Sequence, residues 1–385
     1  MDRRILWLWL SGRLKLNRRK IKSLIEHFKS IEAVYDAESY RDIENIGRDE
    51  HRSLMDKDLK AAAELYERTT EKGIFILTYD MDEYPDKLRN ISPIPYILYC
   101  KGRLMDFDSI LSVAVVGTRR YSDYGKLATN RIASELAKNG VIIVSGMARG
   151  LDSVAARAAL RAGTPTAAVL GSGLDVVYPP ENEALMNEIV QNGIVISEYP
   201  IGSPPIASHF PERNRIIAGL SNGVLVSQAP NKSGALITAR IAMENGRDVF
   251  AVPGNIFDDS YAGSNRLIQQ GAKLVMCGDD IISEYPYVFR QLSDMPSRVI
   301  AAEPKTEKDE VIRTVEPRRE KIELKDETER NIVEILIERN ANIEDLVQSL
   351  KMDIRDLNIK ITMLEMRGII EKLPGNIYKL KMSGQ

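Results

Sequence analysis

Hydrophobic and polar positions follow different periods in successive parts of the chain. Within the first 72 residues, apolar side chains recur at helical spacing, as in Ile21, Leu24 and Phe28. From about residue 110 to 285, short apolar runs rich in β-branched residues alternate with glycine-containing loops and helical segments. Regular alternation of this kind favours a parallel sheet that is covered by helices on both faces.

The apolar runs locate the strands of this sheet, and two earlier runs are expected to add strands to the same domain. The main runs are 113–116, 141–144, 166–170, 194–196, 223–226, 248–252 and 273–276, and the earlier ones are 74–78 and 95–100. The pattern predicts an α/β fold with a doubly wound, mostly parallel sheet.

The C-terminal part has another organisation. Residues 289–322 are poor in large apolar groups and contain three prolines, which predicts a flexible linker. Three helical patterns and a hairpin with a turn at 374–376 follow, which is typical of a winged helix over 323–385. The expected domains are therefore 1–72, 73–288 and 323–385. Acidic and basic residues are nearly balanced in the last one, so DNA contact and protein contact both stay open for it.

Composition narrows the classes of protein. The chain carries 53 Lys+Arg against 55 Asp+Glu, a net charge of −2, which excludes a uniformly basic DNA-coating protein. Its 2 cysteines are far apart and its 3 histidines lack metal-ligand spacing, so we expect neither a metal nor another cofactor. No apolar run is long enough for a membrane span, and we expect a cytoplasmic protein. A basic cluster in the first 30 residues is interpreted as a solvated helix face rather than a nucleic-acid contact.

Candidate binding residues follow the predicted strands, because ligands of doubly wound sheets bind outside the carboxyl ends of the strands. The glycine-containing and cationic positions there are Gly117, Thr118, Arg119, Arg120, Ser145, Gly146, Arg149, Gly150, Lys232, Ser233 and Gly234. Glycines let a backbone approach a ligand, and amides at helix starts attract phosphate. Together the loops predict a phosphate-binding rim, although a single strand–glycine junction is usually only a turn, and Arg149 could pair with Asp152 instead.

The helical segment 210–219 adds Arg213, Asn214 and Arg215 to the candidates. Two residues apart on a helix, the arginines are not expected to face inward together, so one should anchor a loop while the other reaches the rim. No GxGxxG follows the first strand, the chain has no Walker motif, and no catalytic Ser-His-Asp set can be proposed around His209. These absences argue against dinucleotide binding, ATP hydrolysis and serine-hydrolase chemistry.

Six strings carry a resemblance to a known family: VVGTR at 115–119, SGMARGLD at 145–152, FPERNRIIAG at 210–219, KSGALITA at 232–239, VFAVPG at 249–254 and NRLIQQGA at 265–272. In this order they resemble the bacterial DNA processing protein A (DprA, or Smf) family over residues 75–285. The flanks agree, since such proteins commonly carry an N-terminal helical domain and a C-terminal winged helix.

The resemblance implies an extended Rossmann fold that binds single-stranded DNA, protects incoming strands in natural transformation and loads the RecA recombinase. It implies no enzymatic activity, a homodimer formed through the Rossmann domain, and DNA contacts by the Gly117–Thr118–Arg119 motif and Lys232. Bases would stack on aromatic side chains. The candidates are Tyr121, Tyr124, Phe210 and Tyr261, although for each of them taken alone a core position is favoured.

An enzymatic alternative is a nucleotide phosphoribohydrolase-like Rossmann protein acting on nucleoside monophosphates. It would need a PGGxGTxxE string, which this sequence lacks. The sequence also departs from the family pattern at three places: Ala156 for histidine, Gln228 for glutamate and a displaced Ser260. These departures weaken the idea that a histidine or glutamate there performs acid–base chemistry, and they leave the phosphate contacts untouched. A third hypothesis, a protein-interaction scaffold, overlaps with recombinase loading, which needs a partner surface.

Overall fold

The computed structural model describes residues 2–286 and 288 and, near the C-terminus, 327–338, 341–350, 352, 357, 360–361, 363–365, 369–373 and 377–380. The chain divides into two compact units, Met1–Pro304 and Lys305–Gln385. The predicted linker 289–322 and the predicted turn at 374–376 lie outside the described residues.

A nine-stranded sheet forms the centre of the first unit, in the order β1-β2-β6-β5-β4-β3-β7-β8-β9. The strands are β1 (Phe75–Thr78), β2 (Ile97–Gly102), β3 (Ser112–Val116), β4 (Ile142–Ser145), β5 (Thr166–Leu170), β6 (Ile194–Ser197), β7 (Gly223–Val226), β8 (Asp248–Ala251) and β9 (Lys273–Leu274). The pairings of β1 with β2 and of β2 with β6 are antiparallel, and the other pairings in this sheet are parallel. The chain leaves β3 in one direction for β4 to β6 and returns to its other side for β7, so the topological switch point lies between β3 and β7.

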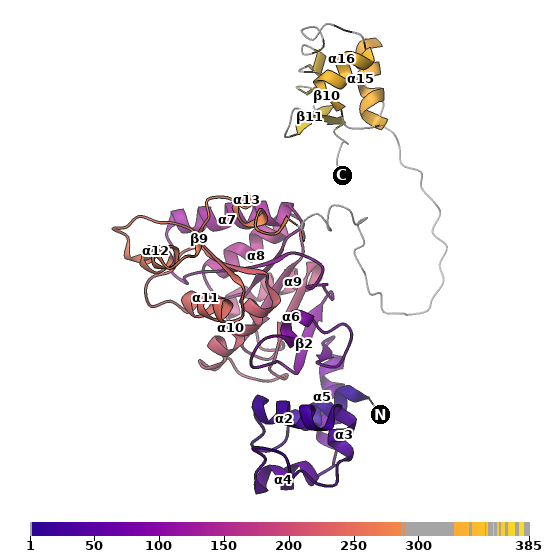
Figure 1. The fold of residues 1–385 in the computed structure, drawn as a ribbon, viewed down its shortest axis with the longest axis vertical. Coiled ribbons are helices and arrows are strands. Elements are labelled where there is room, and N and C mark those ends of the chain that lie inside the picture. Colours follow the sequence, from indigo (N-terminus) through magenta and orange to yellow (C-terminus); the bar gives the residue numbers. More distant parts are fainter. Residues whose placement is uncertain are drawn as a thin grey trace. The chain divides into compact units, whose positions relative to one another are not determined.

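Helices cover both faces of the sheet, as predicted (Figure 1). Residues of β3 alternate between two cores: Val113 and Val115 pack with α7 (Asp123–Lys138) and α8 (Leu151–Arg161). Ala114 and Val116 pack with α10 (His209–Leu220) and α11 (Gly234–Glu244) on the other face. The remaining elements are α6 (Asp86–Arg89), η1 (Pro180–Asn182), α9 (Glu183–Asn192), η2 (Asp259–Tyr261), α12 (Ala262–Gln269) and α13 (Asp279–Ile282).

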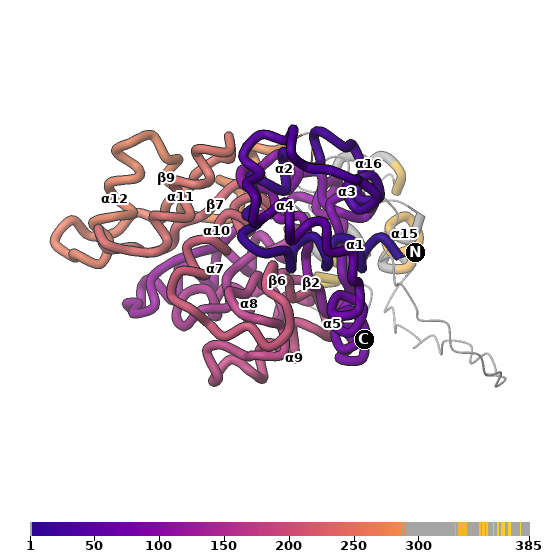
Figure 2. Tube along the Cα trace, turned by 90° about the horizontal axis from the view of Figure 1, so that it is seen from below, coloured from indigo at the N-terminus to yellow at the C-terminus, as the bar shows by residue number. Residues whose placement is uncertain are grey.

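Five helices precede the sheet: α1 (Arg3–Ser11), α2 (Arg18–Phe28), α3 (Ile31–Asp36), α4 (Arg48–Met55) and α5 (Lys60–Glu71). They gather at the β1–β2 end of the sheet, as Figures 1 and 2 show. Buried Trp7 of α1 stacks on Tyr96 just before β2, with ring centroids 5.5 Å apart. Helices and sheet thus share an apolar core within one compact unit, and the boundary expected at residue 72 stays a prediction.

The second unit combines α15 (Glu327–Glu338), β10 (Ala341–Asn342), α16 (Ile343–Leu350), β11 (Ile370–Leu373) and β12 (Ile377–Leu380). The strands form a sheet in the order β10-β12-β11, and Ile332, Leu346 and Tyr378 lie in its core. The hairpin was predicted, whereas the two-residue strand β10 was too short to show in the apolar pattern. Only part of the third predicted helix lies within the described residues. The α/β class and the winged helix are confirmed.

Candidate nucleic-acid interface

An open cleft of about 880 Å³ lies at the carboxyl edge of the sheet, at the switch point. The loop after β3, the start of α10 and the loop that opens α11 form its walls. Most of the predicted site residues line it: Gly117, Thr118, Arg119, Arg120, Arg213, Asn214, Lys232, Ser233 and Gly234. Segments more than 100 positions apart in the sequence therefore meet in one cleft.

A smaller recess adjoins the cleft and is lined by Gly146 and Arg149. Cleft and recess have Arg119, Phe210 and Arg213 in common, so the loop after β4 borders the same surface.

Three of the predicted site residues line neither the cleft nor the recess: Ser145, Gly150 and Arg215. Ser145 is buried and its hydroxyl donates to the Val115 carbonyl at 2.7 Å, which ties β4 to β3. Gly150 has φ 90° and packs against the backbone of Thr118, so it supports the loop after β3 from below. Arg215 lies on the far side of α10.

Replacement of Gly150 by alanine should lower the free energy of unfolding by about 3 kcal/mol, because positive φ is unfavourable for alanine and the new Cβ would overlap a packed backbone. That Cβ would lie 2.4 Å from the Thr118 carbonyl oxygen. Gly163 is the matched control: its φ is 77° but its Cβ would meet nothing within 4 Å. Urea denaturation should give a loss of only about 1 kcal/mol for Gly163→Ala. Equal losses would show that Gly150 does not support the loop by contact.

Arg213 anchors the floor of the cleft. Its Nη1 donates to the Gly146 carbonyl at 2.8 Å and also to the Val169 carbonyl, so it joins the ends of β4 and β5. Asp152, which is buried beside it, accepts a hydrogen bond from the Gly146 amide at 3.2 Å. Burial lowers the pKa of Arg213 to about 10, although the charge of Asp152 opposes this shift, and burial raises the pKa of Asp152. Arg213 is therefore an internal support of the cleft.

The expectation that Arg213 and Arg215 would not both face inward is wrong. Both side chains are buried. Helix α10 is enclosed on opposite sides, by the cleft loops around Arg213 and by Glu198 around Arg215, whose Nη2 donates to the Glu198 carboxylate at 2.5 Å. A two-residue spacing sends the side chains to different sides, and here both sides are covered.

Exposed cations remain around the cleft after this internal pairing. Arg119, Arg120 and Lys232 are exposed, and none of them forms an ion pair with another described residue. Arg149 differs, because its Nη2 donates to Glu181 at 3.0 Å. This pair is exposed at the surface, and the suggested partner Asp152 is instead engaged below the cleft. Three cations thus face solvent without a neutralising partner, which suits the binding of an anion.

The aromatic candidates divide between surface and core. Phe210 lines the cleft, and the Arg119 guanidinium lies 5.9 Å from its ring centre. Tyr121 and Tyr124 are exposed. Tyr261 is only 1% exposed and its hydroxyl lies 3.1 Å from that of Ser122, so it is a core residue and no stacking candidate.

Tyr178, which the sequence analysis missed, also lines the cleft and lies 5.4 Å from Phe210 between ring centres. The position of Tyr178 in the sequence could have indicated it, because it follows β5 in a loop at the same edge of the sheet and precedes two prolines.

Other kinds of site find little support in the described part of the chain. It contains no group of three or more His, Cys, Asp or Glu side chains that could hold a metal ion. No helix in the described ranges is long and apolar enough to cross a membrane. The cleft offers hydrogen-bond donors, positive charge and aromatic faces, which is the chemistry that nucleic acids need.

Comparison with known proteins decides the family. The family model of DNA recombination-mediator protein A matches residues 75–286, and that of the DprA winged helix domain matches residues 316–376. The chain belongs to the DprA family. The resemblance seen in the sequence is thereby confirmed, and DprA family members are DNA-processing proteins by name.

Individual DprA relatives extend the match. Protein Smf of Synechocystis sp. is 33% identical over 384 residues, which cover 93% of this chain and 94% of that protein. The DNA processing protein DprA of Streptococcus pneumoniae is 47% identical over 206 residues, 54% of this chain and 72% of that protein.

Two solved DprA structures are similar to the fold. DprA from Streptococcus pneumoniae superposes with a TM-score of 0.63 at 35% identity, covering 74% of this chain and 98% of that one. DNA processing protein A from Helicobacter pylori, described by its single-stranded DNA binding mode, gives a TM-score of 0.50 at 35% identity over 55% of this chain and 94% of that one.

Proposed function

We propose that this chain binds single-stranded DNA in the cleft between the loop after β3 and the start of α11. One observation carries the proposal: Arg119, Arg120 and Lys232 come from distant segments and surround one open cleft, unpaired within the described residues and beside the half-buried ring of Phe210. Cations follow a phosphate backbone, and aromatic rings accept unstacked bases. A duplex keeps its bases stacked and would leave the ring of Phe210 without a partner.

The site residues have distinct roles in this proposal. Arg119, Arg120 and Lys232 contact phosphates. Backbone amides of 117–118 and 233–234 approach the strand closely, because glycines stand at 117 and 234. Arg149, Asn214 and Gly146 border the surface. Ser145, Gly150 and Arg213 support it from inside, whereas Arg215 pairs with Glu198 on the far side of α10. The Helicobacter pylori relative, described by its single-stranded DNA binding mode, supports single-stranded DNA as the ligand.

Family membership also supports a proposal about partners. We infer that the chain protects incoming single strands in natural transformation, loads the RecA recombinase onto them and acts as a cytoplasmic homodimer without enzymatic activity. Two clefts on one strand would bind more tightly than one, because the second contact forms at high effective concentration. Release of free base from AMP by the purified chain would instead favour the phosphoribohydrolase hypothesis.

Salt dependence tests the cleft as a phosphate site. Each phosphate contact with a single strand contributes a slope of about −0.7 to the plot of log binding constant against log salt concentration. With three unpaired cations we expect a slope of about −2 for a labelled oligothymidine, measured by fluorescence anisotropy. Arg120→Ala should reduce the magnitude of the slope by about 0.7. A binding constant independent of salt would contradict phosphate binding.

A further inference from the structure

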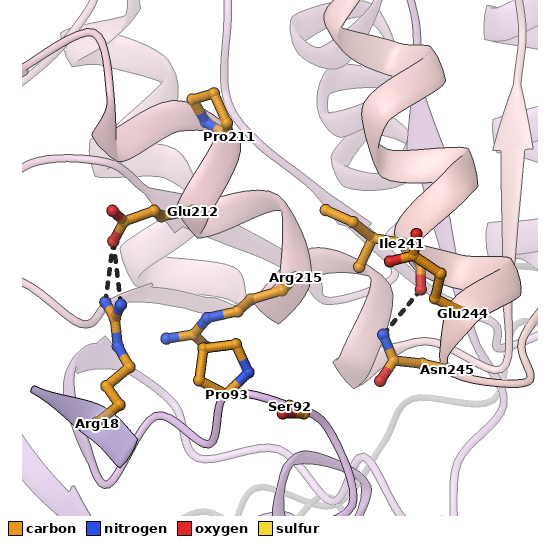
Figure 3. Close-up of a pocket in the computed structure, with 9 residues that line it drawn as sticks. All are labelled: Arg18, Ser92, Pro93, Pro211, Glu212, Arg215, Ile241, Glu244 and Asn245. Carbon is orange, nitrogen blue, oxygen red and sulfur yellow. Dashed lines mark hydrogen bonds and ion pairs between the residues drawn. The ribbon is translucent and has the colours of Figure 1, made fainter. Parts of the chain in front are cut away.

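Helix α10 borders a second pocket on the side away from the cleft. This pocket, of about 410 Å³, lies among α2, the loop at Ser92–Pro93 and the end of α11, and Glu212 and Arg215 of α10 line it (Figure 3). On the other side, the same helix supplies Phe210, Arg213 and Asn214 to the cleft. One rigid element therefore connects the pocket to the proposed DNA site.

Ion pairs across this pocket join α2 to α10. Glu198, which directly follows β6, accepts hydrogen bonds from Arg18 Nε and Nη2, both at 2.8 Å, and from Arg215 Nη2 at 2.5 Å. Arg18 also donates from Nη1 and Nη2 to Glu212 Oε2, each at 3.1 Å (Figure 3). Arg18 thus connects the first helices of the chain to both the sheet edge and α10.

Because its charges are partly buried, this network holds α2 and α10 together more strongly than an exposed ion pair would. The side chains of Arg215 and Glu198 are 4% and 12% exposed, and that of Arg18 is 30% exposed. Salt screens such partly buried charges much less than exposed ones. The guanidinium of Arg18 holds two carboxylates in fixed directions, which a single flexible ammonium group does not do.

The network is also incompletely satisfied. Nε and Nη1 of Arg215 are buried and have no hydrogen-bond partner among the residues that the structure describes. Unpaired buried donors are costly, and native structures contain few of them. Without Arg18, Glu212 is free to pair with Arg215, since the two are three positions apart on one helix.

We propose that Arg18 is a positioning residue for DNA binding, which acts by holding α10 and with it Phe210, Arg213 and Asn214 in the geometry of the cleft. The inference rests on the proposed function. In this proposal, the contact between α2 and α10 favours the binding of a single strand, and the binding of a single strand favours the contact. Such coupling is reciprocal: if the contact tightens DNA binding, DNA tightens the contact by the same factor.

Arg18→Ala in the full chain tests this inference. Its affinity for labelled oligothymidine should fall on the order of five- to tenfold, the lower part of the usual range of coupling. Lys22→Ala is the control on the same helix, because Lys22 is 58% exposed and pairs only with Glu26 of α2 among the described residues. Glu212→Gln, an exposed and conservative change, should weaken binding in the same direction but less.

Hydrogen exchange distinguishes this coupling from a purely structural role of Arg18, because a structural role alone would not make the exchange of the α2 amides depend on DNA. In the wild type, oligothymidine should slow the hydrogen exchange of the α2 amides. In Arg18→Ala, the exchange rate of these amides should be the same with and without oligothymidine. If Arg18→Ala does not fold, Glu212→Gln carries both measurements. Wild-type DNA affinity in the variants, or α2 exchange that does not respond to DNA in the wild type, would overturn the coupling alone. A wild type that binds no oligothymidine would overturn the proposed function as well.

Discussion

Replacement of Lys232 by glutamate should weaken single-stranded DNA binding by about 100-fold or more and leave the fold intact. Lys232 is exposed in the loop that opens α11, where Ser233 caps the helix by accepting a hydrogen bond from the Ala235 amide at 3.3 Å. The change removes one attraction to phosphate and adds one repulsion at the same place. Two such terms amount to about 3 kcal/mol near a protein surface, which is about 100-fold in affinity.

Arg119→Glu should have a comparable effect, because Arg119 lines both the cleft and the adjoining recess and also contacts the ring of Phe210. Lys138→Glu is the matched control. Lys138 ends α7 and is exposed at the opposite edge of the sheet, so it carries the same change of charge far from the cleft. Binding constants come from anisotropy titrations and folding from circular dichroism. If Lys138→Glu weakened binding as much as the other two, attraction would depend on total charge and not on the cleft.

Arg213→Met should lower the free energy of unfolding by about 3–5 kcal/mol, the cost of leaving a buried charge without its partner. The arginine joins the carbonyls of Gly146 and Val169 and lies beside Asp152, whose own burial already disfavours its charged form. Methionine fills similar space but removes the charge and all donors. The loops after β4 and β5 would lose their common anchor, and urea denaturation measures the loss.

A second substitution separates charge from packing in this site. Asp152→Asn on the Arg213→Met background removes the uncompensated carboxylate, and it should restore part of the lost stability. Asp152→Asn alone should be destabilising, because the positive charge of Arg213 then has no counterion. Strictly additive losses in the double variant would contradict an interaction between the two side chains.

The strands, the position of the cleft and most of its residues could be predicted because they depend on local patterns. Apolar runs mark buried parallel strands, and the topology of a doubly wound sheet brings the loops after them to one edge. Gly117 and Lys232 are 115 positions apart, yet both follow strands that are neighbours at the switch point. No side-chain detail was needed for that conclusion.

Contacts between distant side chains could not be predicted. The partner of Arg149 is Glu181, 32 positions away, whereas the sequence suggested the nearby Asp152. Helical periodicity assumes one buried face, and α10 has two, so the inward position of both Arg213 and Arg215 was missed. The sequence pattern made Tyr261 a stacking candidate, but its ring packs against Ser122 and Tyr124 and is buried in the core. These outcomes depend on tertiary packing.

The most direct test compares single-stranded and duplex oligonucleotides of equal length with the wild type and Lys232→Glu. Competition in anisotropy titrations at one salt concentration gives the affinity for each. The cleft predicts that the wild type prefers the single strand and that Lys232→Glu loses this binding. Equal affinity of the wild type for both forms, or single-strand binding that is unchanged in Lys232→Glu, would contradict the assignment of the cleft.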